Sequence, residues 1–264
     1  FDSGLGGLSV LKQFIRFLPA ENYVYLGDTA RVPYGNKSKE TVNNYAAQCA
    51  EFLLKKDVKL IVVACNTVSS VALEKVTEIA GNVPVVGMIK PGAGAALRAT
   101  LNNNIGIIGT RATISSNAYT DEIDRIKNDR AIQTHSMACP LFVPIVEEGM
   151  LRTQASRLIA TEYLQELKDK NIDTLILGCT HYPLLSHLIS EILPGVTLID
   201  SGEHASVTSL RLLAEQRLLK DDTGKFIEKP KIDFYVTDLP QTFHQQAAAF
   251  LGFEVDSPEL VYLG

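Results

Sequence analysis

The chain has 264 residues and a formal net charge of −5, with 25 basic and 30 acidic side chains. Its length allows two compact domains, each with its own hydrophobic core, or one large domain. The charge is slightly negative and Lys and Arg form no cluster, so we expect neither nucleic acid nor a membrane surface as a partner. No apolar stretch reaches the length of a membrane span.

The four cysteines do not have the spacing of a metal site or a redox pair. They are Cys49, Cys65, Cys139 and Cys179, and no two of them form a C-x-x-C motif. We therefore predict reduced thiols, a cytoplasmic protein and no bound metal.

The first residues predict a loop between a strand and a helix. Residues 2–8 read Asp-Ser-Gly-Leu-Gly-Gly-Leu, and an amphipathic helix should follow until Pro19 stops it. We therefore expect a strand before Phe1, so that the natural chain would begin upstream. The glycine spacing does not match G-x-G-x-x-G, and Asp2 would repel a phosphate. We favour a tight turn that carries Asp2 and Ser3 into a pocket.

Apolar strand patterns and amphipathic helix patterns alternate through the next ninety residues. We predict strands over residues 23–26, 58–64 and 84–88, and helices over 38–56, with Ser38 as N-cap, and 68–80. In the turn-like loop 31–35, Pro33 and Gly35 would let backbone amides approach a ligand. Tyr34 could face that ligand or anchor the loop, and the sequence leaves both open. The Pro-Gly-Ala-Gly run at 91–94 predicts a crossing into a second domain.

The alternation then starts afresh. We predict strands over residues 105–110, 131–137, 174–178 and 196–201, and helices over 113–127, 151–168 and from about Pro183 onward. Prolines interrupt residues 139–144, which lead to Glu147. A helix over 204–219, a polar loop over 220–225, a strand over 232–236 and a helix over 239–251 then return to the first domain.

This alternation predicts an α/β fold of two similar doubly wound domains, with mostly parallel sheets and an active-site cleft between them. We assign residues 1–91 plus 205–264 to the first domain and residues 92–204 to the second.

A repeated motif suggests the chemistry of that cleft. Residues 60–64 form an apolar run followed by Cys65-Asn66-Thr67, and residues 174–178 form a similar run followed by Cys179-Thr180-His181. Each cysteine would lie at the carboxyl end of a buried strand, where open α/β sheets bind ligands. The following helix N-terminus would favour the thiolate. We therefore predict two thiols facing each other across one cleft.

Two such thiols could invert a stereocentre, because one can remove a proton from one face of a carbon while the other returns a proton to the opposite face. Other interpretations remain open. His181 could serve a cysteine hydrolase, although nothing matches it beside Cys65. A redox pair would more often be C-x-x-C, and free cysteines are often simply buried small residues. A two-domain solute-binding protein would share the layout without needing paired cysteines.

Four stretches of the chain resemble the motifs of one enzyme family and occur in the same order: Phe1 to Val10, Asp28 to Gly35, Ala64 to Thr67, and Gly178 to Pro183. On these residues the chain resembles the glutamate racemases of the cofactor-independent aspartate/glutamate racemase family. Aspartate racemases usually have Glu where this chain has His181. The resemblance implies an isomerase that supplies D-glutamate for peptidoglycan, with glutamate as its partner and no cofactor. The oligomeric state stays open, with a homodimer as one possibility.

The resemblance also implies residue roles. Cys65 would act as the base on D-glutamate and Cys179 as the base on L-glutamate. Thr110 and Thr113 would bind a substrate carboxylate. Asp2, His181 and Glu147 would tune the thiols, with the adjacent Glu148 as an alternative to Glu147. The remaining substrate contacts would come from Asp2, Ser3, Pro33, Tyr34, Gly35, Asn66, Thr67, Thr180 and His181.

Overall fold

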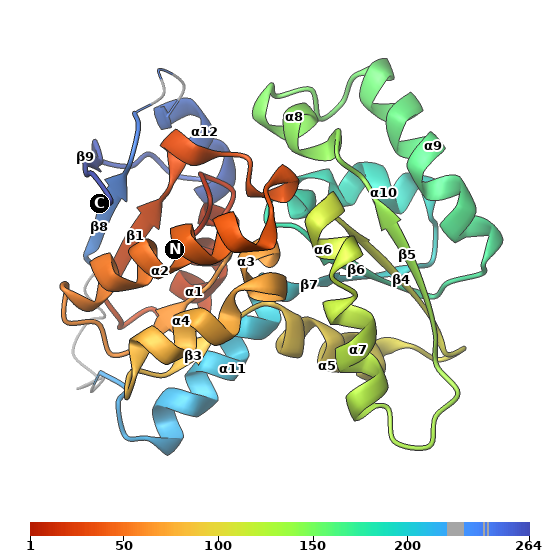
Figure 1. Ribbon diagram of the computed structural model, residues 1–264. Coiled ribbons are helices and arrows are strands. Elements are labelled where there is room, and N and C mark those ends of the chain that lie inside the picture. The colour runs from red at the N-terminus through yellow and green to blue at the C-terminus, as the bar shows by residue number, and fades with distance from the viewer. Residues whose placement is uncertain (221–229, 240, 242) are drawn as a thin grey trace.

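The computed structural model describes residues 1–220, 230–239, 241 and 243–264 (Figure 1). The first part contains α1 (Leu8–Phe17), β1 (Tyr23–Gly27), the 3-10 turns η1 (Thr29–Arg31) and η2 (Tyr34–Asn36), α2 (Lys39–Leu54), β2 (Ile61–Val62), α3 (Asn66–Val71), α4 (Leu73–Ala80), β3 (Val85–Val86) and α5 (Ile89–Ala99). The chain continues with β4 (Asn104–Gly109), α6 (Arg111–Ser115), α7 (Ala118–Ile126), β5 (Gln133–Ala138), α8 (Phe142–Glu147), α9 (Gln154–Asp169), β6 (Thr174–Gly178), η3 (Tyr182–Leu185), α10 (Ser186–Ile192), β7 (Thr197–Asp200) and α11 (Ser201–Glu215). It ends with β8 (Ile232–Val236), α12 (Phe243–Leu251) and β9 (Glu259–Leu260).

The first sheet combines strands from both ends of the chain. β8 pairs in parallel with β1 and with β9, and β2 pairs in parallel with β3. Phe1 and Asp2 lie between these two groups. The Asp2 amide donates to Leu26 O at 3.0 Å, and the Phe1 nitrogen donates to Val62 O at 2.8 Å. In Figure 1 this half lies on the left, in red, orange and blue.

The second sheet has the order β5-β4-β6-β7, and all its strands are parallel. It lies on the right of Figure 1. β6 is buried along its whole length, as expected for a central strand covered by helices on both faces. The predicted α/β fold with parallel sheets is therefore confirmed.

Several local predictions are confirmed by the backbone. The Ser38 hydroxyl accepts from the Thr41 amide at 3.3 Å and caps α2. Pro183 lies in the first turn of η3, where its missing N–H is not needed. The predicted strand 232–236 is β8, and it adds to the first sheet beside β1.

The predicted break at 91–94 is wrong as local structure, because these residues lie inside α5. Pro91 is the third residue of that helix, where the amide has no intrahelical acceptor, so proline is tolerated. The same reason explains why Pro144 lies inside α8 although 139–144 was expected to be interrupted. The proposed domain boundaries stay a prediction.

Other boundaries also shift. The predicted helix 68–80 begins earlier, at Asn66, and divides into α3 and α4 at Ala72, whose φ of −134° is not helical. The predicted strand 58–64 shortens to β2. The helix expected from 204 begins at Ser201, with the Asp200 carboxylate as its cap. Most of the expected loop 220–225, together with residues 240 and 242 of the expected helix 239–251, lies outside the described residues.

Among the described residues, we find no helix that is both long enough and apolar enough to cross a lipid bilayer. No group of three or more His, Cys, Asp or Glu side chains within this part of the chain could hold a metal ion.

Candidate active site

The two motif cysteines come from different sheets and meet at their edges. Cys65 follows β2 and occupies the N-cap of α3, and Cys179 follows β6. Their exposed fractions are only 5% and 6%. They are close enough that the charge of a Cys179 thiolate contributes to raising the pKa of Cys65. The fold therefore brings together two thiols that are more than a hundred residues apart in the chain.

Cys65 lies in surroundings that favour its protonated form. Burial is the largest cause, and the negative charge of Asp2 adds to it, so the pKa of Cys65 rises to about 12. The Ser3 hydroxyl, 3.6 Å from Sγ, and the Val68 amide lower this pKa by less. The expectation that the helix N-terminus would favour a Cys65 thiolate is wrong, because burial and the charge of Asp2 outweigh the hydrogen bonds from the Val68 amide and Ser3. Cys65 is a thiol at neutral pH.

Cys179 has a cationic partner instead. The Nδ1 atom of His181 lies 3.9 Å from the Cys179 sulfur, and Nε2 lies 3.0 Å from a Glu147 carboxylate oxygen. Burial lowers the pKa of His181, but the hydrogen bonds with Cys179 and Glu147 outweigh it and raise this pKa to about 10. A protonated His181 can therefore donate to both neighbours at neutral pH, and it can stabilise negative charge on the Cys179 sulfur.

The sequence left Glu147 and Glu148 as alternatives beside His181, and the geometry separates them. The Glu147 side chain reaches the imidazole although 42% of it is exposed. Among the described contacts, Glu148 makes none with His181, and it lies at the exposed end of α8. Glu147 is thus the carboxylate that contacts the histidine.

The glycine-rich loop at the chain start packs directly against the Cys179 motif. A Cβ atom on Gly6 would lie 2.4 Å from the His181 ring and 2.4 Å from the Thr180 hydroxyl. The neighbouring Ser9 hydroxyl contacts Thr180 O at 2.7 Å and Gly6 O at 2.8 Å. Glycine at position 6 therefore permits close backbone contact between the two halves of the site. Ser9 was not among the predicted site residues, because it lies within an otherwise amphipathic helix.

Asp2 is a buried carboxylate with acceptor capacity to spare. It is 0% exposed, and its Oδ2 accepts from the Gly4 amide at 3.0 Å. Its Oδ1 has no hydrogen-bond partner among the described residues. A buried carboxylate oxygen without a partner is unfavourable unless a cation or donor reaches it. This position suits an ammonium group.

Three threonine hydroxyls join the two halves of the site. Thr67 of α3 lies 2.9 Å from Thr110 and 3.4 Å from Thr113, and the latter two are 3.0 Å apart. A Cβ atom on Gly35 would lie 2.8 Å from the Thr110 Cβ, so the loop 31–35 closes over this hydroxyl cluster. Several hydroxyl donors gathered in this way can bind a carboxylate.

The structure favours one of the two interpretations of Tyr34. Its side chain is 1% exposed, and its hydroxyl donates to the Asp28 carboxylate, so the ring anchors the loop. Only its backbone remains for a ligand contact. Pro33 lies beside it at the exposed surface of the loop.

Asn66 is held by two residues that the sequence did not single out. The Tyr119 hydroxyl donates to Asn66 Oδ1 at 2.6 Å and lies 2.7 Å from the Ser201 hydroxyl. Tyr119 belongs to an ordinary amphipathic pattern, and Ser201 follows a strand. Neither position carries a local signal that could have identified it.

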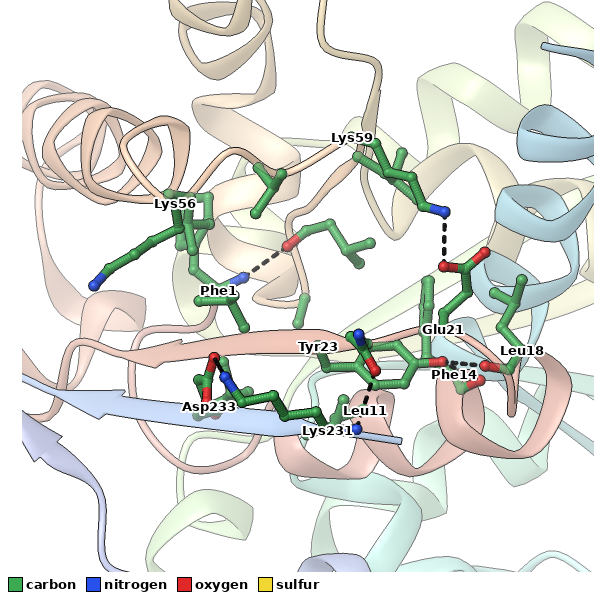
Figure 2. A pocket seen from close by; sticks show the side chains of 18 of the residues that line it. Phe1, Leu11, Phe14, Leu18, Glu21, Tyr23, Lys56, Lys59, Lys231 and Asp233 are labelled. Carbon is green, nitrogen blue, oxygen red and sulfur yellow. Dashed lines mark hydrogen bonds and ion pairs between the residues drawn. The ribbon is translucent and has the colours of Figure 1, made fainter. Parts of the chain in front are cut away.

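One well-formed cavity lies elsewhere in the molecule (Figure 2). It measures about 530 Å³ and lies between α1, β1 and the segment 58–64. Figure 2 shows the Lys59–Glu21 ion pair, 2.7 Å long, at its edge. Neither Cys65 nor Cys179 lines this cavity, so it is separate from the cysteine site.

Comparison with known proteins places this arrangement in a class. The model of the Asp/Glu/hydantoin racemase family matches residues 5–207, which is more than half of the chain. The chain therefore belongs to the family of aspartate, glutamate and hydantoin racemases, and within it to the glutamate racemases.

The relatives support this placement over the full length. A glutamate racemase of Neisseria meningitidis is 46% identical over 264 residues, which cover 100% of this chain and 96% of the relative. One from Chlorobaculum tepidum is 48% identical over 262 residues, with 99% and 94% covered. The crystal structure of Francisella tularensis glutamate racemase in complex with D-glutamate aligns with a TM-score of 0.91 at 44% identity, covering 100% of this chain and 96% of the other.

Proposed function

We propose that this chain interconverts L- and D-glutamate by a two-base mechanism in which Cys65 and Cys179 act on opposite faces of the substrate α-carbon. One observation carries the proposal. Two buried cysteines from separate sheets lie near each other, and their charged neighbours differ. Cys65 holds its proton because of burial and Asp2, whereas Cys179 has a protonated His181 beside it.

In the direction from L to D, the Cys179 thiolate removes the α-proton of L-glutamate. The electron pair of the broken C–H bond stays on the substrate, spread over its α-carboxylate. The Cys65 thiol then donates its proton to the other face, forming the new C–H bond of D-glutamate. Cys179 ends as a thiol and Cys65 as a thiolate, and proton exchange with solvent restores the starting state. The reverse reaction uses the same groups in exchanged roles.

The polar groups around the cysteines suit the substrate. The α-ammonium would take the free Oδ1 of Asp2, and the Thr110 and Thr113 hydroxyls would bind a carboxylate. Thr67 and Thr180 would donate to the oxygens on which charge develops in the transition state, and the Asn66 amide would donate to a substrate carboxylate. Ser3 and the backbone of Pro33, Tyr34 and Gly35 would complete the enclosure.

We also propose how the chain divides into domains and what the protein does in the cell. Residues 1–91 plus 205–264 would form one domain and residues 92–204 the other, with glutamate bound in the cleft between them in the cytoplasm. Domain closure would exclude water and strengthen the polar contacts. The D-glutamate produced would enter peptidoglycan, so growth of a host depleted of this protein should be restored by external D-glutamate.

The direct test is racemisation by single-cysteine variants, followed by circular dichroism with no added cofactor. Cys65→Ala and Cys179→Ala should each lower turnover in both directions by about 10²–10⁴-fold, since each direction needs both groups. Cys49→Ala and Cys139→Ala are the matched controls, because both are buried thiols in the same apolar clusters as Cys65 and Cys179 but lie outside the two strand-end motifs, and they should leave turnover near normal. A Cys65 or Cys179 variant that racemises at the wild-type rate would refute the mechanism.

Heavy water gives a second, independent measurement. The product enantiomer should carry solvent deuterium at the α-carbon, while recovered substrate stays largely protiated early in the reaction. This pattern follows because the returned proton comes from the opposite thiol, which has exchanged with solvent. Rapid deuteration of the substrate before any product appears would instead indicate a single base that works on one face.

A further inference from the structure

Tyr119 lies at the junction of four helices near the cysteine site. It projects from α7, and its ring lies between Gly92 of α5 and Gly178 at the end of β6. Cβ atoms on those two glycines would lie 3.1 and 3.2 Å from the ring. The ring is therefore confined on two sides, immediately before Cys179. Helices α3, α5, α7 and α11 contact one another here, and α5, α7 and α11 can be followed in the lower half of Figure 1.

The Tyr119 hydroxyl is the central member of a buried chain of three polar groups. It has a single hydrogen, which it donates to Asn66 Oδ1 at 2.6 Å. The Ser201 hydroxyl, 2.7 Å away at the start of α11, then supplies the donor to Tyr119. All three side chains are buried, with exposed fractions of 1–4%. The chain of bonds thus has one direction, from Ser201 through Tyr119 to Asn66.

This direction determines how the Asn66 amide is oriented. Its oxygen is used by Tyr119, so its NH2 group must face the other way. Within the described part of the chain, no acceptor is hydrogen-bonded to that NH2 group, and it is not among the fully enclosed groups without a partner. Asn66 directly follows Cys65, so a donor here lies beside the proposed reaction centre.

We propose that Tyr119, held by Ser201, is a positioning residue that fixes the Asn66 amide with its NH2 group toward a substrate carboxylate. This inference rests on the proposed function, because it takes glutamate as the ligand. Tyr119 itself does not touch the substrate. Tyr119 keeps the neutral Asn66 NH2 group in place and does not change the charge of the site. Its loss should therefore weaken substrate binding.

The test is a double-mutant cycle on Tyr119 and Asn66. Tyr119→Phe keeps the confined ring and removes only the hydroxyl. We expect kcat/KM to fall about threefold to tenfold, the range for one neutral hydrogen bond. The loss should appear mainly in KM, with kcat close to wild type, and in a weaker Kd for D-glutamate by calorimetry. In an Asn66→Ala background, Tyr119→Phe should change KM and the Kd for D-glutamate by less than about twofold, because the donor that Tyr119 positions is gone.

A control separates this effect from general loss of stability. Tyr23 also uses its hydroxyl internally, with Phe14 O at 2.9 Å and Leu18 O at 2.7 Å, but it lines the separate cavity. Tyr23→Phe should lower Tm without changing KM. If Tyr119→Phe does not fold, Ser201→Ala supplies the same cycle, since it removes the group that orients Tyr119.

The outcomes are distinct. An equal loss of affinity from Tyr119→Phe in both backgrounds, or no loss in either, overturns the positioning role. Wild-type protein that binds no D-glutamate overturns the proposed function, and this inference with it. Binding that shows the predicted coupling while single-cysteine variants remain active supports the positioning role and refutes only the two-base mechanism.

Discussion

Glu147→Gln tests whether the carboxylate beside His181 sets the charge of the imidazole. The substitution keeps the shape of the side chain and removes its charge. The contact is 3.0 Å long, but 42% of the Glu147 side chain is exposed, so solvent screens the pair. We estimate that the pair loses about 1 kcal/mol of interaction free energy, which corresponds to roughly 0.7 pKa unit. The pKa of His181, about 10 in the wild type, should therefore fall toward 9.

An NMR titration of the histidine ring protons measures this shift directly. The chain has five histidines, so His181→Gln identifies the relevant resonance. Glu148→Gln is the matched control, because it removes the same charge one residue away, and it should leave the titration of His181 unchanged.

Turnover gives the functional counterpart. At neutral pH His181 stays protonated in both proteins, so kcat should change by less than about threefold, and the alkaline limb of kcat should move down by about 0.7 pH unit. L- and D-glutamate are enantiomers with equal free energy, so kcat/KM must change equally in both directions. A His181 titration that does not respond to Glu147→Gln would refute the idea that this contact raises its pKa.

Three further predictions use other features of the site. In Gly6→Ala the added Cβ would lie 2.4 Å from His181 and Thr180, so unfolding free energy should fall by about 1–3 kcal/mol with a loss of turnover; a normal Tm and rate would contradict the close packing. The folded pKa of His181 lies above its ordinary 6.5, so its contribution to stability should be complete below pH 6.5 and disappear as pH rises toward 10. Denaturant titrations should show that the unfolding free energy of His181→Asn varies less with pH over that window than the unfolding free energy of the wild type. Glutamate should be racemised in strong preference to aspartate, which turnover of all four enantiomers measures, and comparable rates would contradict the assignment.

The sequence predicted the positions of the functional strand ends well because their signals are local. The apolar runs before Cys65 and Cys179 favour strands, and in parallel α/β sheets the residues after such strands lie at the ligand-binding edge. Thr110 was found in the same way after β4. The boundaries of short elements were less predictable, since β2 exists only where β3 pairs with it.

The sequence could not predict which groups balance the charges in the site. The pKa of Cys65 depends on burial and on Asp2, which is 63 residues away in the chain. The sequence favoured a thiolate there because a helix N-terminus is a local feature, whereas desolvation is set by the whole fold. The pairing of Glu147 with His181 likewise depends on where α8 lies relative to η3, and the sequence alone did not separate Glu147 from Glu148.

The contacts that close the site share a chemical character. Ser9 with Thr180, Thr67 with Thr110, and Tyr119 with Asn66 are all neutral hydrogen bonds across the junction of the two sheets. Each is worth about 0.5–1.5 kcal/mol net, because water can replace it when the groups separate. Charged partners, by contrast, are kept within one motif or one sheet, as in Cys179 with His181. The site is thus joined by weak neutral bonds, and the two cysteines also influence each other across the junction, since the charge of a Cys179 thiolate contributes to raising the pKa of Cys65.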